Sequence, residues 1–267
     1  MKGRKEQRLL VEILRAANGL TSTVTLRRLT RKCDFVMLEE LTARTGLEGL
    51  IYSVCNRKDL AGLFPEGYTG LLLKKAGLAA IRNSFIRENA MEVIEALEKQ
   101  GIRCITLKGI EVLERLYGDD MLRDVLDLDI LVEPGQFTRA TGILYGLGYI
   151  NPEYAGLTLE YDLASGREED LPVELAFVRE AIPYPYIVDL HSELVGFKKG
   201  SLLREIFPVA GFDWHGNAVK ISLEGREVPV LAPEMEFLFM VFHFSMHHSF
   251  MSMKWLSDLC RMVMRYQ

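Results

Sequence analysis

The sequence predicts an α+β protein, in which a helical N-terminal region precedes a mixed β-sheet core with flanking helices. Up to about residue 97, apolar residues recur at helical spacing, as Leu9, Leu10 and Ile13 do. Beyond Gly101 the pattern changes to short alternating or continuous apolar runs, which are typical of strands. With 267 residues, 49% of them hydrophobic, the chain is long enough to bury a substantial core.

These changes of pattern divide the chain into three segments. Residues 1–97 form the helical region, residues 98–232 the sheet core, and residues 233–267 two helices that pack on that core. Within the core we expect strands and a hairpin whose turn is Glu224-Gly225. The strands are expected at roughly 103–107, 126–132, 157–163, 172–178 and 185–191, and the hairpin at 217–231.

Helices are expected between and after these strands. One over 110–117 is ended by Gly118, and another covers 136–145. Pro233 suits the first turn of a helix that continues to about residue 248, since no N–H is needed there. The last helix covers 254–265.

The charge is unevenly distributed along the chain. The formal net charge of −5 argues against a dedicated nucleic-acid coat protein, yet residues 1–32 carry nine Lys or Arg against two Glu. Such a segment can dock on phosphates or can form the solvated face of an amphipathic helix, and we favour the second interpretation.

The sequence also argues against export and against membrane insertion. The N-terminal apolar stretch is broken by Glu12 and Arg15, which a signal peptide would not tolerate. No apolar run approaches the length of a membrane span. The four cysteines are scattered without metal-binding spacing, which indicates reduced thiols in a cytoplasmic protein.

The run from Val125 to Val132 carries the strongest chemical signal. Side chains alternate between the faces of a strand, so Asp127 and Asp129 share one face while Leu126 and the other apolar residues pack on the core. Two carboxylates this close repel each other unless a cation lies between them or one is protonated. Such a pair suits a divalent-metal site for phosphoryl or nucleotidyl transfer.

An Asp-x-Asp triplet alone favours a solvated strand edge over a metal site. Its context favours the metal site. The apolar run continues on both sides, the turn Lys108-Gly109 precedes it, and Arg123 lies four residues before the first aspartate.

Further motifs follow in a recognisable order. They are Leu107-Lys108-Gly109, Tyr117, Arg123, Asp127-Leu128-Asp129-Ile130-Leu131-Val132, Leu144-Tyr145-Gly146-Leu147-Gly148-Tyr149, Val188-Asp189-Leu190-His191, the histidines from His243 to His247, and Trp255-Leu256-Ser257-Asp258. Together they resemble the uncharacterised nucleotidyltransferase family, a branch of the polymerase-β-like nucleotidyltransferase superfamily. The resemblance spans most of residues 90–265.

The resemblance implies a small mixed sheet with flanking helices and a three-carboxylate site for Mg²⁺ or Mn²⁺. Asp127 and Asp129 would be two of the ligands, with Asp189 as the third and Glu174 as the alternative. His191 lies two residues after Asp189 and shares its face, so it would point into the same cleft. It is equally compatible with a hydrogen-bonded strand-end histidine that has no chemical role.

The turn Lys108-Gly109 stands where most of the superfamily has Gly-Ser or Gly-Gly. Gly109 still allows close backbone approach and leaves N–H groups at the start of helix 110–117 available to an anion. Lys108 could replace the missing hydroxyl as a phosphate contact. Arg123 is expected to grip phosphate oxygens when nucleotide is bound, and otherwise to pair with a nearby acid such as Asp127.

The sequence leaves three functions open. The first is a nucleotidyltransferase that uses Mg²⁺ to move a nucleoside monophosphate from a nucleoside triphosphate to a hydroxyl of a small molecule, a protein or an RNA, with release of pyrophosphate. The second is a catalytically inactive nucleotide-binding or regulatory module of the same fold. The third is a metal hydrolase built on His243, His247 and His248, although these residues also suit a packed or cleft-lining helix.

Overall fold

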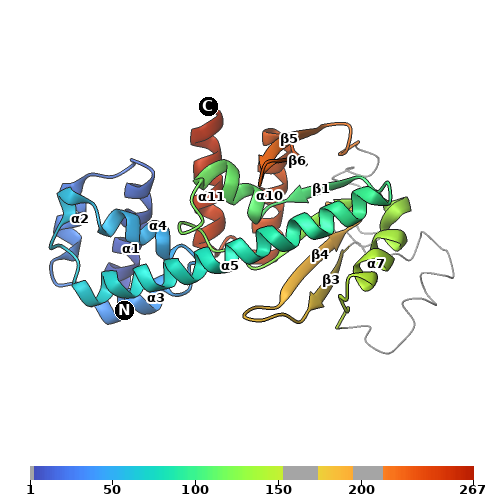
Figure 1. Ribbon diagram of the computed structural model, residues 1–267. Helices are drawn as coiled ribbons and strands as arrows, with labels where there is room; N and C mark the ends of the chain where they lie inside the picture. Colours follow the sequence, from blue (N-terminus) through green and yellow to red (C-terminus); the bar gives the residue numbers. More distant parts are fainter. Residues whose placement is uncertain (1–2, 153–173, 195–212) are drawn as a thin grey trace. The chain divides into compact units, whose positions relative to one another are not determined.

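The computed structural model describes residues 3–152, 174–194 and 213–267 (Figure 1). They divide into two compact units, each built from segments that are far apart in the sequence. The helical unit comprises Met1–Ser84, Val112–Val125 and His243–Gln267, and the sheet unit comprises Phe85–Glu111 and Leu126–Phe242. The division into three consecutive segments therefore stays a prediction, and the strand expected at 157–163 lies outside the described residues.

The helical unit begins with four short helices, α1 (Arg4–Ala17), α2 (Thr23–Thr30), α3 (Phe35–Thr42) and α4 (Glu48–Cys55). The apolar stripe of α1 is buried as its spacing predicts, and Leu9 and Ile13 belong to one core cluster with Leu38 and Ile51. The carboxylate of Asp34 accepts the N–H groups of Val36 and Met37, the second and third residues of α3, at 3.1 Å, which satisfies donors that a helix start leaves unpaired.

A short 3-10 turn, η1 (Lys58–Leu60), leads to the long helix α5 (Glu66–Lys99), which contributes to both units. The helical unit is completed by a π-helical turn, η2 (Leu113–Tyr117), and by the last helix, α11 (Met253–Tyr266). The helices expected over 254–265 and at the N-terminal region are thus present, with bounds shifted by a residue or so.

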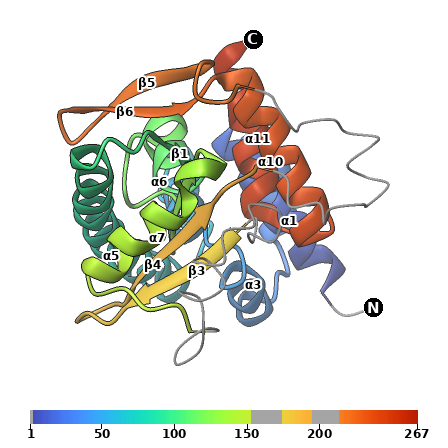
Figure 2. The same cartoon turned by 90° about the vertical axis from the view of Figure 1, so that its right-hand side faces the viewer.

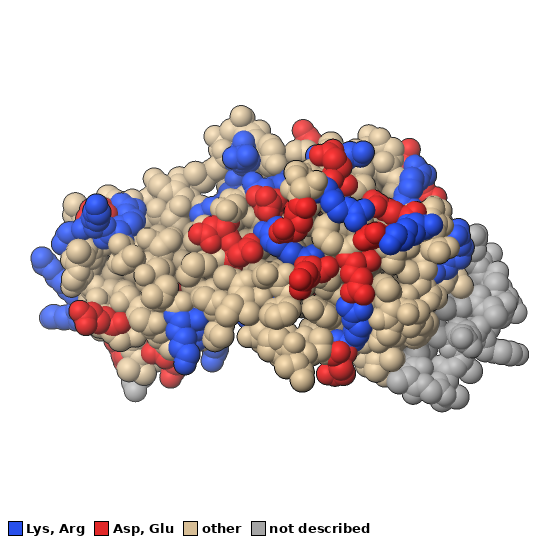
Figure 3. Space-filling model, viewed as in Figure 1, with Lys and Arg blue, Asp and Glu red and all other residues tan. Residues whose placement is uncertain are grey.

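The basic N-terminal stretch is amphipathic in the structure. Its two acids, Glu6 and Glu12, are buried, whereas seven of its basic side chains are exposed. Figure 3 shows Lys and Arg over the α1–α2 part of the visible face. The exposed basic residues are Arg4, Arg8, Arg15, Arg27, Arg28, Arg31 and Lys32. This distribution is what the solvated-face interpretation predicts.

The sheet unit contains a six-stranded mixed sheet in the order β3-β4-β2-β1-β6-β5. Its strands are β1 (Cys104–Leu107), β2 (Leu128–Val132), β3 (Glu174–Arg179), β4 (Tyr186–His191), β5 (Ala218–Leu223) and β6 (Arg226–Leu231). β5 and β6 form the expected hairpin, and its turn residues Glu224 and Gly225 have φ of 50° and 76°. Two successive left-handed residues match the twist of a two-residue hairpin. The mixed sheet with flanking helices confirms the α+β class.

Helices cover both faces of this sheet. In Figure 2, α7 (Phe137–Gly146) and α5 lie on one side and α10 (Pro233–His248) on the other. Leu107 and Leu131 pack with Phe239 of α10 in one buried cluster. Since alternate residues of a strand share a face, Asp129 lies on the same face as Leu131, the face that α10 covers.

Two local expectations differ from the structure. β2 starts at Leu128 rather than at residue 126, and Leu126 is 48% exposed instead of buried in the core. The helix expected over 110–117 is a single α-turn, α6 (Ile110–Val112), continued by the π-helical η2 and ended by Gly118 at φ 64°. Within the described part of the chain, no helix combines the length and apolar character needed to cross a bilayer.

Candidate functional site

The sheet brings three aspartates together. β2 and β4 are parallel neighbours, and their register pairs Asp129 with Asp189. Asp127 lies just before the first residue of β2. Each of the three offers a carboxylate oxygen, and these oxygens lie within 4.8 Å of one another. The structure thus gathers all three of the ligands expected from the sequence.

Asp129 is the buried centre of this cluster. Its Oδ1 accepts a hydrogen bond from the ammonium of Lys108 at 2.9 Å and lies 3.2 Å from Nε2 of His191. Burial would raise the pKa of Asp129, but Lys108 and His191 outweigh burial and lower it to about 2. The other oxygen, Oδ2, is buried and has no hydrogen-bond partner in the described part of the chain.

Asp189 has the opposite electrostatic environment. Burial raises its pKa, and repulsion from Asp129 and Asp127 adds to the shift, while Lys108 opposes it. The net result is a pKa of about 7. The pKa values of these two adjacent carboxylates therefore differ, because Asp129 has the direct contact with a cation and Asp189 experiences mainly burial and repulsion.

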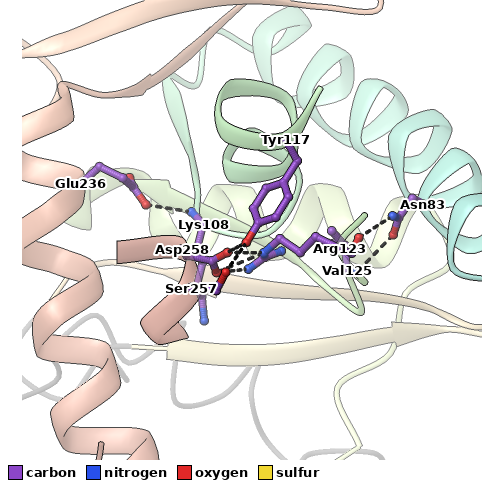
Figure 4. A network of polar contacts seen from close by, with 8 residues as sticks. All are labelled: Asn83, Lys108, Tyr117, Arg123, Val125, Glu236, Ser257 and Asp258. Carbon is purple, nitrogen blue, oxygen red and sulfur yellow. Dashed lines mark hydrogen bonds and ion pairs between the residues drawn. The ribbon is translucent and has the colours of Figure 1, made fainter. Parts of the chain in front are cut away.

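The turn after β1 holds Lys108 in an unusual conformation. Its φ is 23°, and that of Gly109 is 56°, so both residues lie in the left-handed region. A side chain there costs free energy, and such strain persists only where the surroundings enforce it. The backbone N–H of Lys108 donates to Oε1 of Glu236 at 3.3 Å, while the ammonium pairs with Asp129 (Figure 4 shows the first contact). Two buried carboxylates thus fix this residue.

The charge of Lys108 is also set by the cluster. The side chain is buried, which by itself would lower the pKa of the ammonium. The neighbouring Asp129, Asp127 and Asp189 outweigh burial and raise it. Lys108 is therefore a cation held among three carboxylates.

His191 lies between two acids. Nε2 faces Asp129, and Nδ1 lies 3.8 Å from Oε2 of Glu174, which is opposite His191 in the β3–β4 register. The expectation that His191 points towards the carboxylate site agrees with this geometry. Glu174, the alternative third ligand, instead lies on the far side of the histidine from Asp129.

Arg123 has an ion-pair partner that the sequence did not single out. Its Nε and Nη2 donate to the carboxylate of Asp258 at 2.9 to 3.0 Å, and both side chains are buried. The hydroxyl of Tyr117 donates to the same carboxylate at 2.7 Å (Figure 4). Any phosphate contact of Arg123 would compete with this pair. Asp127 belongs to the other unit, so its expected pairing with Arg123 stays a prediction.

Asn83 of α5 fixes the segment that precedes the aspartates. Its side-chain amide donates to the carbonyl oxygens of Asp120 and Arg123 at 2.8 Å each. Its Oδ1 accepts the N–H of Val125 at 3.0 Å. One buried amide therefore holds both ends of the loop 120–125, and Figure 4 shows its contacts with Arg123 and Val125.

The histidines of α10 form ring contacts in the helical unit. The His243 ring lies 4.6 Å from Trp255 and 5.2 Å from His248, and His248 stacks on Trp255 at 5.5 Å. The side chain of His247 lies outside the described set. Among the described residues, the metal-ligand atoms that converge closely enough to hold an ion belong to the aspartate cluster and not to these histidines. The packing interpretation of these histidines is favoured over a zinc site.

Sequence reasoning missed Glu236, Asn83 and the pairing role of Asp258. Glu236 is fully buried in the first turn of a helix rich in apolar residues. The sequence signal for it is weak, because Glu234 in the same turn is an acid that stays exposed. Asp258 was visible as a motif residue, but its partner Arg123 lies 135 positions away. Asn83 gives no comparable signal.

The aspartate cluster fits a divalent cation. Its donors are carboxylate oxygens alone, which suits hard ions such as Mg²⁺ and Mn²⁺ and not a thiolate- or imidazole-preferring metal. The unpartnered Oδ2 of Asp129 is a buried acceptor for which a cation would be the natural partner. Asp127, Asp129 and Asp189 are therefore the residues that could hold the ion.

The comparison of the sequence with known families agrees with this chemistry. The chain matches the profile of the uncharacterised nucleotidyltransferase family over residues 34–267, and it belongs to that family. Among curated proteins none matches the sequence. One similar solved structure is the crystal structure of an antigenic nucleotidyltransferase-like protein from Paracoccidioides brasiliensis, with a TM-score of 0.40 and 13% identity over 68% of this chain and 74% of that one.

Proposed function

We propose that the protein is a nucleotidyltransferase that uses Mg²⁺ or Mn²⁺ to move a nucleoside monophosphate from a nucleoside triphosphate to an acceptor hydroxyl. The observation that carries this proposal is the convergence of Asp127, Asp129 and Asp189, one of which has a buried oxygen without a hydrogen-bond partner among the described residues. Membership of the family supports the same reaction class.

The three aspartates would hold the divalent ion, and Lys108 would contact the phosphates. A bound ion neutralises phosphate charge and lowers the pKa of a coordinated hydroxyl. The flexible ammonium of Lys108 reaches out from a backbone that Glu236 fixes, so it can follow phosphate oxygens as a point charge. Gly109 leaves room for close approach of the triphosphate to the backbone.

The reaction forms a bond between the acceptor oxygen and the α-phosphorus and breaks the bond between that phosphorus and the β-phosphate oxygen. Pyrophosphate leaves with the bonding pair. Asp189 is our candidate to receive the acceptor's proton, because its carboxylate lies beside the proposed ion site, where the acceptor hydroxyl would be held. His191, in contact with Asp129, would hold that carboxylate in place.

The test separates binding from turnover. Calorimetric titration with Mg-ATP measures binding, and a pyrophosphate-release assay with each of the four nucleoside triphosphates measures turnover in the presence of small-molecule, protein and RNA acceptor pools. We expect release that depends on the divalent ion and is lost in Asp129→Asn, because that change removes a ligand while nearly keeping the side-chain volume. The matched control is Glu227→Gln, an exposed residue of β6, which should behave as wild type.

The outcomes distinguish the two functions that the family allows. Binding of Mg-ATP without release in any acceptor pool would support the inactive nucleotide-binding or regulatory module. Release that survives Asp129→Asn would contradict the proposal, because β2 would then not carry the chemistry.

A further inference from the structure

The aspartate cluster contains its own cation. The ammonium of Lys108 lies 2.9 Å from Oδ1 of Asp129, and both side chains are buried. Asp127 and Asp189 each have a carboxylate oxygen within 4.8 Å of one of Asp129, so their charges also act on this ammonium. One positive charge therefore partly compensates three clustered carboxyl groups in the absence of a metal ion.

Two anchors hold Lys108 at different points. Its backbone N–H is bound by Glu236 of α10, and its φ of 23° shows that this backbone position is imposed. Its ammonium is bound by Asp129 and stands at the end of a flexible four-carbon side chain. The ammonium can therefore leave Asp129 by side-chain rotation while the backbone stays where it is.

We propose that Lys108 is an exchangeable counterion that couples divalent-ion binding to triphosphate binding. The proposal rests on the proposed function, since it assumes that a divalent ion and a triphosphate share this site. In the nucleotide-free protein, Lys108 occupies the negative potential that the ion needs, so the ion binds weakly. When a triphosphate is present, its oxygens attract the ammonium, and the carboxylates become available to the ion.

The direction of the effect follows from charge alone. A monovalent and a divalent cation that compete for the same carboxylates repel each other, and at separations of a few ångströms that repulsion is substantial even near a protein surface. The divalent ion competes with the ammonium of Lys108, and the triphosphate draws that ammonium away. Each ligand therefore changes the affinity for the other, by the same factor in both directions. Removal of the ammonium should therefore strengthen the binding of the ion and weaken the binding of the nucleotide.

The test measures Mn²⁺ binding from the electron paramagnetic resonance signal of free Mn²⁺, without nucleotide, in wild type and in Lys108→Met. Coupling between ligands at linked sites is typically about 5–150-fold, and we expect Lys108→Met to bind Mn²⁺ about tenfold more tightly than wild type. The same variant should bind a non-hydrolysable ATP analogue with Mg²⁺ more weakly. Lys220→Met, on the exposed side of β5, is the matched control and should change neither affinity.

A second measurement needs no variant and remains decisive if Lys108→Met fails to fold. In ¹⁵N-labelled wild-type protein, titration with Mg²⁺ alone should shift the ammonium resonance of Lys108 and leave that of Lys220 unchanged. An unchanged Lys108 resonance at Mg²⁺ concentrations that saturate the protein would overturn the proposal.

The failure of this proposal differs from the failure of the proposed function. If wild type binds Mn²⁺, Asp129→Asn does not, and Lys108→Met binds it no more tightly than wild type, the metal site stands and the counterion role is wrong. If Lys108→Met binds both Mn²⁺ and the ATP analogue more weakly than wild type, the counterion role is wrong and Lys108 is a structural residue only. If neither wild type nor Lys108→Met binds Mn²⁺, both proposals are overturned.

Discussion

At the residue scale, Asp129 and Asp189 occupy paired positions on neighbouring strands but have pKa values of about 2 and about 7. The difference has one source. Lys108 and His191 both contact the carboxylate of Asp129, so Asp189 experiences burial and repulsion without a comparable partner. The metal-free cluster therefore keeps a proton at Asp189 that a divalent ion would displace.

This proton gives a pH dependence with a definite sign. In the metal-free folded protein the pKa of Asp189 is raised from 3.8 to about 7, so the folded state holds a proton that the unfolded chain has already lost. The contribution of this proton to the free energy of unfolding is complete below the pKa that Asp189 has in the unfolded chain. It is lost as the pH rises through 7, the pKa in the folded state. Asp189→Asn should therefore be more stable than wild type at pH 8 in EDTA, by roughly 1–3 kcal/mol, with a smaller difference at pH 5. Urea denaturation at both pH values measures the difference in unfolding free energy between Asp189→Asn and wild type. The same difference at pH 5 and pH 8 would contradict the prediction.

The Arg123–Asp258 pair gives a second prediction at this scale. Arg123→Met leaves the buried carboxylate of Asp258 without its ion-pair partner, and breaking a buried pair from one side costs roughly 3–5 kcal/mol. The double variant Arg123→Met/Asp258→Leu removes both charges, so its loss should be smaller than that of Arg123→Met alone. Thermal denaturation of both variants and of the single variant Asp258→Leu measures this, with the exposed Arg44→Met as the control. A double variant that loses the sum of the two single effects would show that the pair is not coupled.

At the element scale, α4 packs directly on the segment that leads to the aspartates. A Cβ on Gly49 would lie 1.6 Å from the carbonyl oxygen of Met121, and the N–H of Leu50 donates to the carbonyl of Leu122 at 3.2 Å. The absence of a side chain at Gly49 is therefore required for this contact. Asn83 fixes the same segment from α5.

Gly49→Ala should consequently destabilise the fold, because backbone cannot move aside as a flexible side chain can. We expect a loss of at least about 3 kcal/mol, at the upper end of overpacking effects. The matched control is Gly77→Ala in α5, where a new Cβ meets nothing within 4 Å, and helix propensity predicts a gain of up to about 1 kcal/mol. Melting temperatures of the two variants measure the contrast, and equal effects would contradict it.

The elements differ in how far the sequence determines them. The change of periodicity at Gly101 and the Glu224-Gly225 turn depend on local patterns, and both are confirmed. Leu126 was expected in the core because alternation was extended to residue 126, but the strand starts at Leu128 and alternation does not apply before it. The π-helical η2 replaced an expected α-helix, since nothing in the local pattern signals the wider turn.

At the scale of the whole molecule, the site depends on contacts between distant parts of the chain. The motif residues were visible in the sequence, but the Glu236–Lys108 contact joins residues 128 positions apart. The grouping of Val112–Val125 with the N-terminal helices follows from such long-range contacts, which periodicity does not encode. The sequence thus predicted that Asp127, Asp129 and Asp189 come together, whereas the partners of these carboxylates required the three-dimensional arrangement.

A ligand that binds the folded state should stabilise the whole protein. A ligand at 100 times its dissociation constant adds about 2.7 kcal/mol to the free energy of unfolding. We therefore expect Mg²⁺ together with the preferred nucleoside triphosphate to raise the melting temperature of wild type, and EDTA to reverse the shift. Screening the four triphosphates identifies the preferred base. An equal shift in Asp129→Asn would show that the ion binds elsewhere.

The most direct measurement of the central claim compares the fate of two labels. The protein is incubated with Mg²⁺ and the preferred triphosphate, labelled at either the α- or the γ-phosphorus, together with separate small-molecule, protein and RNA acceptor pools. Nucleotidyl transfer predicts that one pool retains the α-label and not the γ-label, and that Asp129→Asn retains neither while Glu227→Gln behaves as wild type. Retention of the γ-label by an acceptor, or retention of the α-label by Asp129→Asn, would contradict the account.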